Sequence, residues 1–278
     1  AAIVLLLPAL ALSAVTGLDI YLCILAMGVL STAYTVLGGI EAVIWTDVLQ
    51  VVVLLGGAIA AIAIISFGID GGFGAIIETA QAHDKLRLIN LDWSLASDGI
   101  LVLFLASIFT NLIPYTSDQA VVQRYLTTPD EASTRRAIWT NAWLSLPASL
   151  LFFFLGTALF AWYSQMPERL GVLEQRDQIL PWFVANEMPA GLAGLVIAGV
   201  FAAAMSSLDS SMHSIATVTT KDLFKLDSAR EPEAALRTAR ITTLLLGVLG
   251  TATAALLASF EIQSLWTIFL QTIGLCLG

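Results

Sequence analysis

Charged side chains are scarce in this sequence of 278 residues. Asp, Glu, Lys and Arg together make up 12% of it, whereas a soluble domain usually carries about 25%. Hydrophobic residues make up 58%, and they are gathered in runs of about 17 to 25 residues, the length that a helix needs to cross a bilayer. This composition excludes an ordinary soluble domain and indicates an all-α integral membrane protein with several spans.

Other features are missing as well. The short alternating segments of a membrane β-barrel are absent, and the only two cysteines, Cys23 and Cys276, lie inside apolar runs, so the sequence indicates neither a disulfide framework nor a metal cluster. The first run begins at Ala1 without the basic flank of a signal peptide, and the last run stops at Gly278. We therefore expect an internal fragment of a longer, transporter-sized chain.

Basic residues are outnumbered, with 12 Lys and Arg against 21 Asp and Glu and a formal net charge of −9. Most of the acids fall in connecting segments, so we interpret the excess as solvated loop charge. Placing the connections alternately on two sides of a membrane groups most basic residues together, and the positive-inside rule makes that side cytoplasmic. The expected location is the plasma (cell inner) membrane. The grouped residues are Arg124, Arg135, Arg136, Lys221, Lys225, Arg230, Arg237 and Arg240.

One apolar run, residues 191–220, carries an unusual load of polar side chains. A carboxylate such as Asp209 costs roughly 2.5 to 3.5 kcal/mol near the bilayer centre, so it should face a bundle interior or a wet cavity. At about 100° per residue, the hydroxyl residues fall on one side of a helix, with Asp209 at the edge of that stripe. We expect this helix to form a wall for a cation and a substrate.

Sodium prefers oxygen ligands, as calcium does, and its single charge suits neutral hydroxyls and carbonyls with at most one carboxylate. Ser206 and Ser207 aim two hydroxyls about 100° apart, and an exposed carbonyl near Ala203 would complete the group. The alternative is that these small residues serve tight helix packing and bond back to their own helix.

Two acids, Asp47 and Asp209, fall within or at the edge of predicted spans. Each would either bind a cation or carry a proton, and the alternative for Asp47 is a cap at a helix start. An intramembrane enzyme with both as an acid pair is a further possibility, but no accompanying catalytic motif supports it. We therefore do not expect an enzyme.

A second unusual run, residues 99–125, is interrupted by polar residues and by Pro114. Proline removes a backbone donor, so we expect a break or kink near Asn111 to Pro114; the alternative is a helix that ends at Pro114. Interrupted spans point to transporter binding sites. Asn111 and Gln271 suit a polar organic substrate, or they satisfy the backbone of a broken helix.

Three separated segments, GGIEAVIWTDVLQ, TSDQAVVQRYLTT and AAAMSSLDSSMHSIATVTTKD, resemble signatures of the sodium:solute symporter family. The resemblance implies an inverted-repeat fold of ten core helices in two five-helix repeats. On that frame residues 1–278 form a single transmembrane domain of about eight helices, from part of the third core helix to part of the tenth. On the same resemblance, we expect the first and second core helices to lie outside these residues.

The family also implies site residues. Ser206 and Ser207, with the Ala203 carbonyl, correspond to the shared sodium site. Asp47, Asp209 and Ser210 correspond to a second sodium site of some members. Asp209 replaces the usual serine or threonine, which either strengthens that site or converts it to proton coupling.

The substrate positions implied by the family are Asn111, Tyr115, Thr116 and Gln271. We therefore expect sodium-coupled symport of a small polar organic solute or organic anion, with a transporter-like sensory module of a signalling protein as the alternative. The expected partners are sodium, the solute and the lipid bilayer. Neither nucleic acid nor an obligatory protein partner is expected.

Overall fold

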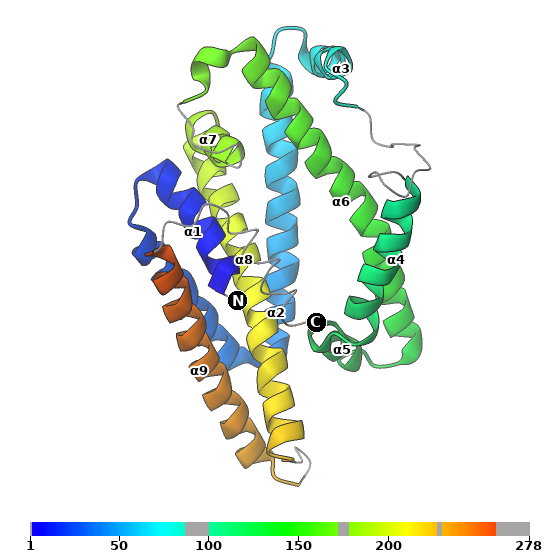
Figure 1. Ribbon diagram of the computed structural model, residues 1–278, viewed down its shortest axis with the longest axis vertical. Coiled ribbons are helices and arrows are strands. Elements are labelled where there is room, and N and C mark those ends of the chain that lie inside the picture. Colours follow the sequence, from blue (N-terminus) through cyan, green and yellow to red (C-terminus); the bar gives the residue numbers. More distant parts are fainter. Residues whose placement is uncertain (1, 87–99, 172–177, 227–229, 260–278) are drawn as a thin grey trace. The chain divides into compact units, whose positions relative to one another are not determined.

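The computed structural model describes residues 2–86, 100–171, 178–226 and 230–259, and every regular element within them is helical (Figure 1). The elements, in chain order, are α1 (Ala2–Thr16), α2 (Ile20–Gly68), α3 (Gly72–Ala82), α4 (Ile100–Thr116), α5 (Gln119–Leu126), α6 (Glu131–Gln165), a 3-10 turn (Pro167–Arg169), α7 (Ile179–Asn186), α8 (Ala190–Val218), a π-helical turn (Thr219–Leu223) and α9 (Pro232–Ala258).

Four of these segments are long and apolar enough to cross a membrane, judged by length and composition: α2, α6, α8 with the turn that follows it, and α9. Large apolar side chains on them are exposed, as in Phe153 at 70% and Val29 at 57%, which suits helices that face lipid. The all-α membrane class is thereby confirmed for the described residues. The count of about eight spans stays a prediction.

Helix α2 has 49 residues, about 73 Å at about 1.5 Å per residue, more than twice the thickness of the hydrocarbon core. It is divided at Gly39, whose φ of 59° and ψ of −151° are not helical and suit a residue without Cβ. The sequence predicts a helix end at the glycine pair 38–39, and this prediction is confirmed as a break at Gly39. The sequence also predicts that the next helix begins only at about Asp47, which is wrong, because residues 40–68 are helical and the Thr46 hydroxyl donates to the carbonyls of Ala42 and Val43.

From polar composition, the sequence predicts loops over residues 127–136 and 221–240, followed by helices from Ala137 and from about Ile241. Both loops are shorter in the structure. Helix α6 begins at Glu131 rather than Ala137, because the Asp130 carboxylate accepts the Ser133 N–H at 2.7 Å and caps the helix. Helix α9 begins at Pro232 rather than Ile241, and proline is favoured in the first turn of a helix. A short helix is predicted near residues 74–82 and another within the connection of residues 164–187; the first is confirmed as α3 and the second as α7.

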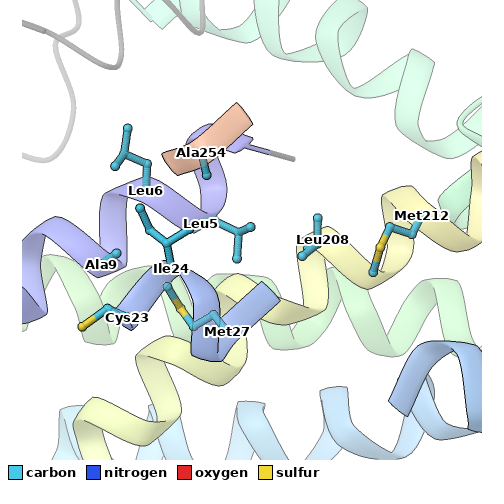
Figure 2. Packing of buried hydrophobic residues seen from close by; sticks show 9 residues of the cluster. All are labelled: Leu5, Leu6, Ala9, Cys23, Ile24, Met27, Leu208, Met212 and Ala254. Atoms are coloured by element: carbon cyan, nitrogen blue, oxygen red, sulfur yellow. The ribbon is translucent and has the colours of Figure 1, made fainter. Parts of the chain in front are cut away.

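The chain forms two compact units, residues 1–57 with 172–278 and residues 58–171. In the first unit, α1, α8 and α9 pack on one another. Figure 2 shows its core, in which side chains of α1, of the first half of α2 and of α8 meet. The core residues are Leu5, Leu6, Ala9, Cys23, Ile24, Met27, Leu208, Met212 and Ala254.

Glycines let the helices of this first unit approach closely. A Cβ added to Gly28 would lie 2.0 Å from the Thr251 side chain, and one added to Gly247 would lie 2.1 Å from Thr32, so α2 and α9 touch through two glycine–threonine pairs. In the same way, Val53 of α2 packs against Gly199 of α8. These contacts fix both halves of α2 against neighbouring helices.

The second unit joins α3 to α6 through aromatic side chains. The Phe73 and Phe154 ring centroids lie 5.2 Å apart, and His83 meets Phe160 edge-on, also at 5.2 Å. The Lys85 ammonium lies 5.0 Å from the centre of the Phe160 ring, a cation–π distance. This unit also contains α4 and α5, which carry part of the predicted substrate residues.

Candidate functional site

The polar second half of α8 does not present a uniform face. Ser206 and Ser210 are half-buried, as is Ala203, while Ser207 is exposed. Asp209 is fully buried, at 0% exposure. Its neighbours on α8, Leu208 just before it and Met212 one turn after it, are also buried and belong to the core shown in Figure 2. The carboxylate therefore lies deeper than the edge of the polar stripe, where the sequence placed it.

Two hydroxyls from the first half of α2 donate to the Asp209 carboxylate. Ser31 donates to one oxygen and Tyr34 to the other. Thr35 faces the same carboxylate, with its hydroxyl buried and making no well-formed hydrogen bond within the described part of the chain. Sequence reasoning missed all three, although their i, i+3, i+4 spacing places them on one helix face.

Asp47 lies in the second half of α2, well inside the helical segment that follows Gly39, and its side chain is half-buried. The interpretation of Asp47 as a helix cap is therefore wrong. Its charge acts on the Asp209 carboxyl, so the structure brings the two acids predicted from the sequence within electrostatic reach of each other.

The serines of α8 fall into two groups. Ser211 donates to the Ser207 carbonyl at 2.8 Å, and Ser214 donates to the Ser210 carbonyl at 2.7 Å. These two hydroxyls follow the packing alternative, since they bond back to their own helix. Ser206 and Ser207 make no such bond to the residues that the structure describes, which leaves their hydroxyls available to a ligand.

The oxygen atoms of these hydroxyl and carboxylate side chains on α2 and α8 are suitable ligands for a hard monovalent cation. Hydroxyl and carboxylate oxygens dominate it, and the described residues contain no group of three or more His, Cys, Asp and Glu side chains that would hold a metal ion. Neutral oxygens with a carboxylate match the charge and the ligand preference of sodium. The residues present therefore fit the ion that the sequence predicts.

The predicted substrate residues of the second unit lie on α4. Asn111 is in this helix, the Tyr115 hydroxyl accepts a hydrogen bond from the Asn141 side-chain amide at 2.8 Å, and the Thr116 hydroxyl donates to the Leu112 carbonyl at 2.5 Å. Gln271 lies outside the described residues. The structure thus brings Tyr115 to Asn141, a polar partner on α6 that the sequence did not single out.

The predicted break in this span falls later than expected. Helix α4 continues through Pro114 to Thr116, so a break at Asn111 to Pro114 is wrong. The next helix starts at Gln119, because the Asp118 carboxylate accepts the Ala120 N–H at 2.8 Å and caps it. A strong cap decides the position of the interruption, rather than the proline.

Comparisons with known proteins agree with these features. The model of the sodium:solute symporter family matches residues 5–276. The sodium/sialic acid symporter NanT of Aliivibrio fischeri is 39% identical over 279 residues, and SiaT of Proteus mirabilis is 38% identical over 280. Both alignments cover 100% of this chain and 55% and 56% of the relative. The rabbit sodium-dependent multivitamin transporter is 34% identical over 235 residues, covering 80% of this chain and 36% of the relative.

A solved structure of a Na⁺-coupled sialic acid symporter, in a substrate-bound outward-open state, superposes with a TM-score of 0.85 at 36% identity. The match covers 94% of this chain and 56% of that one. The chain spans about half the length of the curated relatives that it matches most fully.

The all-helical architecture, its apolar helices of membrane-spanning length and its likeness to a solved symporter define the fold class as that of a membrane transporter. The match over residues 5–276 makes the assignment specific: the chain belongs to the sodium:solute symporter family.

Proposed function

We propose that this chain is part of a sodium-coupled symporter that carries a small organic anion or another small polar organic solute across the plasma (cell inner) membrane. The observation that carries the proposal is the hydroxyl pair of Ser206 and Ser207 on α8, left without bonds to the described residues, in a chain of this family. The reported relatives are transporters, which favours symport over a sensory role.

The proposed first sodium site uses Ser206, Ser207 and the Ala203 carbonyl. The proposed second cation site uses Asp47, Asp209 and Ser210. A solved relative is described as having a novel Na⁺ site, which supports more than one ion per cycle. The second ion is either sodium or a proton.

Ion binding and transport are linked through the equilibrium between conformations. A sodium ion that binds one state better than the other shifts the population toward that state. In the proposed inverted-repeat fold, with a single transmembrane domain of about eight helices in this chain, the site would lie near the membrane midplane. Sodium binding would favour the outward-open state, and rocking of the helices would release ion and solute inward.

The solute would be bound by Asn111, Tyr115 and Thr116 of α4, with Gln271 as a further candidate. The Tyr115 hydroxyl accepts from the Asn141 amide and keeps its own O–H to donate, and the amide keeps a second N–H. Donors of this kind suit a carboxylate or a hydroxyl-rich solute. The named substrates of the relatives, sialic acid and monocarboxylates, both contain an acid group.

The test is uptake of labelled sialic acid and of a short monocarboxylate by the complete natural protein in vesicles. Replacing external sodium with choline should abolish uptake, and the double substitution Ser206→Ala with Ser207→Ala should raise the half-saturating sodium concentration about tenfold or more. Ser211→Ala is the matched control, since that hydroxyl bonds to its own helix. Uptake that is indifferent to sodium, or a double variant that behaves like the control, would refute the proposal.

A further inference from the structure

An apolar groove of about 620 Å³ lies in the first unit, between the first half of α2 and α9 (Figure 1). Its walls are large apolar side chains that stay exposed, such as Val248 at 59%. Its floor is formed where the two helices touch through the glycine–threonine pairs described above, Gly28 with Thr251 and Gly247 with Thr32. We call this feature the α2–α9 groove.

The α2–α9 groove offers no directional partner to a polar ligand. The Thr32 hydroxyl donates to the Gly28 carbonyl at 2.6 Å, and the Thr251 hydroxyl donates to the Gly247 carbonyl at 2.8 Å. Both hydroxyls are therefore occupied by their own helix. The other side chains that line the groove are apolar. Such a surface suits a hydrocarbon chain.

The length of the groove matches one leaflet of a bilayer. The lining residues run from Leu25 to Leu37 on α2 and from Leu244 to Ala255 on α9, about 16 to 18 Å at about 1.5 Å per residue. The hydrocarbon core of a bilayer is about 30 Å thick. A membrane-spanning helix would need a groove across the full thickness, whereas an acyl chain of one leaflet needs about half. The length therefore favours a lipid.

Two exposed arginines of α9, Arg237 and Arg240, lie at one end of the groove. They precede Leu244 by two turns and one turn, so they lie on the helix face that lines the groove. From Ile241 to Ala258 the helix carries no charge, over about 27 Å at about 1.5 Å per residue. Arg240 therefore lies at the edge of the hydrocarbon core, and the positive-inside rule makes this the cytoplasmic edge.

The positive charge of the two arginines is available to a ligand. Neither side chain makes an ion pair or a hydrogen bond within the described ranges. The acids closest to this end along the two helices are Glu233 on α9 and Glu41 after the break of α2, and neither forms an ion pair there. Guanidinium groups bind phosphate through paired N–H donors, and basic sites between helices on the cytoplasmic side bind anionic head groups.

We propose that the α2–α9 groove and the two arginines bind one anionic phospholipid of the cytoplasmic leaflet. One acyl chain lies against the glycine–threonine floor, and Arg237 and Arg240 hold the phosphate. The net charge of the head group decides the selectivity, so phosphatidylglycerol binds better than phosphatidylcholine with the same chains. The bound lipid ties α9 to the first half of α2. This inference goes beyond sodium coupling and does not depend on it.

The experiment is native mass spectrometry of the complete natural protein in detergent, titrated with palmitoyl-oleoyl phosphatidylglycerol or with the phosphatidylcholine of the same chains. The first phosphatidylglycerol should bind about tenfold more tightly than the first phosphatidylcholine. Arg237→Gln with Arg240→Gln should weaken it about tenfold or more, because charge-assisted hydrogen bonds are lost. Arg135→Gln with Arg136→Gln is the matched control, since it removes the same charge from exposed arginines of α6.

A second variant tests the acyl chain. Ala33→Phe places a ring in the groove, and it should weaken the first phosphatidylglycerol about tenfold, the effect of losing the contacts of about two methylene groups. Ala26→Phe is its matched control, since Ala26 is exposed on the same helix and does not line the groove. This control should bind the lipid as the wild type does.

Three results would overturn the inference. The first is equal affinity for the two lipids, and the second is an arginine double variant that binds phosphatidylglycerol as the α6 control does. The third is wild-type affinity in Ala33→Phe, because another part of the complete protein or a second copy then occupies the groove. The arginine variant changes only exposed side chains, so it stays decisive if Ala33→Phe fails to fold. The assay contains no sodium, so its failure leaves the proposed symport standing.

Discussion

Substitution of Gly199 by alanine should destabilise the packing of α8, the helix that carries the site, against α2. An added Cβ would lie 2.7 Å from a Val53 methyl, whereas ordinary contact begins at 3.4 Å. Valine in a helix is stiff about its first side-chain torsion, so the helices must separate by several tenths of an ångström. Such overpacking costs about 1 to 3 kcal/mol.

The assay is thermal unfolding of the complete protein in detergent, followed by tryptophan fluorescence. Gly199→Ala should lower the unfolding temperature, and Val53→Ala in the same background should restore much of the loss, because it removes the clashing methyl groups. Gly194→Ala is the matched control on the same helix, where an added Cβ meets nothing within 4 Å. The reasoning is refuted if Gly199→Ala is as stable as this control, or if Val53→Ala brings no recovery.

Three further outcomes are expected. Gly247→Ala should lower the unfolding temperature more than Gly194→Ala does, because its Cβ would lie 2.1 Å from Thr32 on the facing helix; equal temperatures would contradict the close approach of α2 and α9. Asp118→Ala should cost about 1 kcal/mol of stability by removing the cap of α5, and the conservative Asp118→Asn should recover most of it in the same unfolding measurement. The Ser133 hydroxyl and N–H hold the pKa of the Asp130 carboxyl below its usual range, so the stability that Asp130 contributes should be present above the usual carboxyl pKa and lost as pH falls through the lowered one. A stability difference between wild type and Asp130→Asn that persists unchanged into strong acid would contradict this.

The polar half of α8 could be predicted from the sequence because a carboxylate inside an apolar run is costly in a bilayer and needs a partner. The residues of α2 that contact this carboxylate could not be predicted. Ser31 and Thr35 look like the ordinary hydroxyl residues of an apolar helix, and most such residues bond back to their own backbone, as Thr32 and Thr46 do. Only the packing of α2 on α8 shows which hydroxyls face Asp209 and which bond back to their own helix.

Some helix boundaries could also be predicted from the sequence, and others could not. The break at Gly39 could be predicted because a glycine pair tolerates a backbone conformation that other residues resist. Helices α6 and α9 begin earlier than the sequence predicts. Polar composition favours a loop there, whereas Asp130 and Pro232 are helix-start signals that extend both helices beyond the apolar run. At Pro114 the difference is the reverse: α4 continues past the proline to Thr116, because the capped start of α5 sets the position of the interruption.

The central claim is that sodium drives solute movement through this protein, and the most direct measurement is accumulation of labelled solute in proteoliposomes that contain the complete natural protein. An inward sodium gradient should concentrate the solute above its outside level, and a sodium ionophore should discharge it. With Ser206→Ala and Ser207→Ala together, the same gradient should produce little accumulation. Solute that only equilibrates in the wild type, or that accumulates equally with choline in place of sodium, would contradict the account.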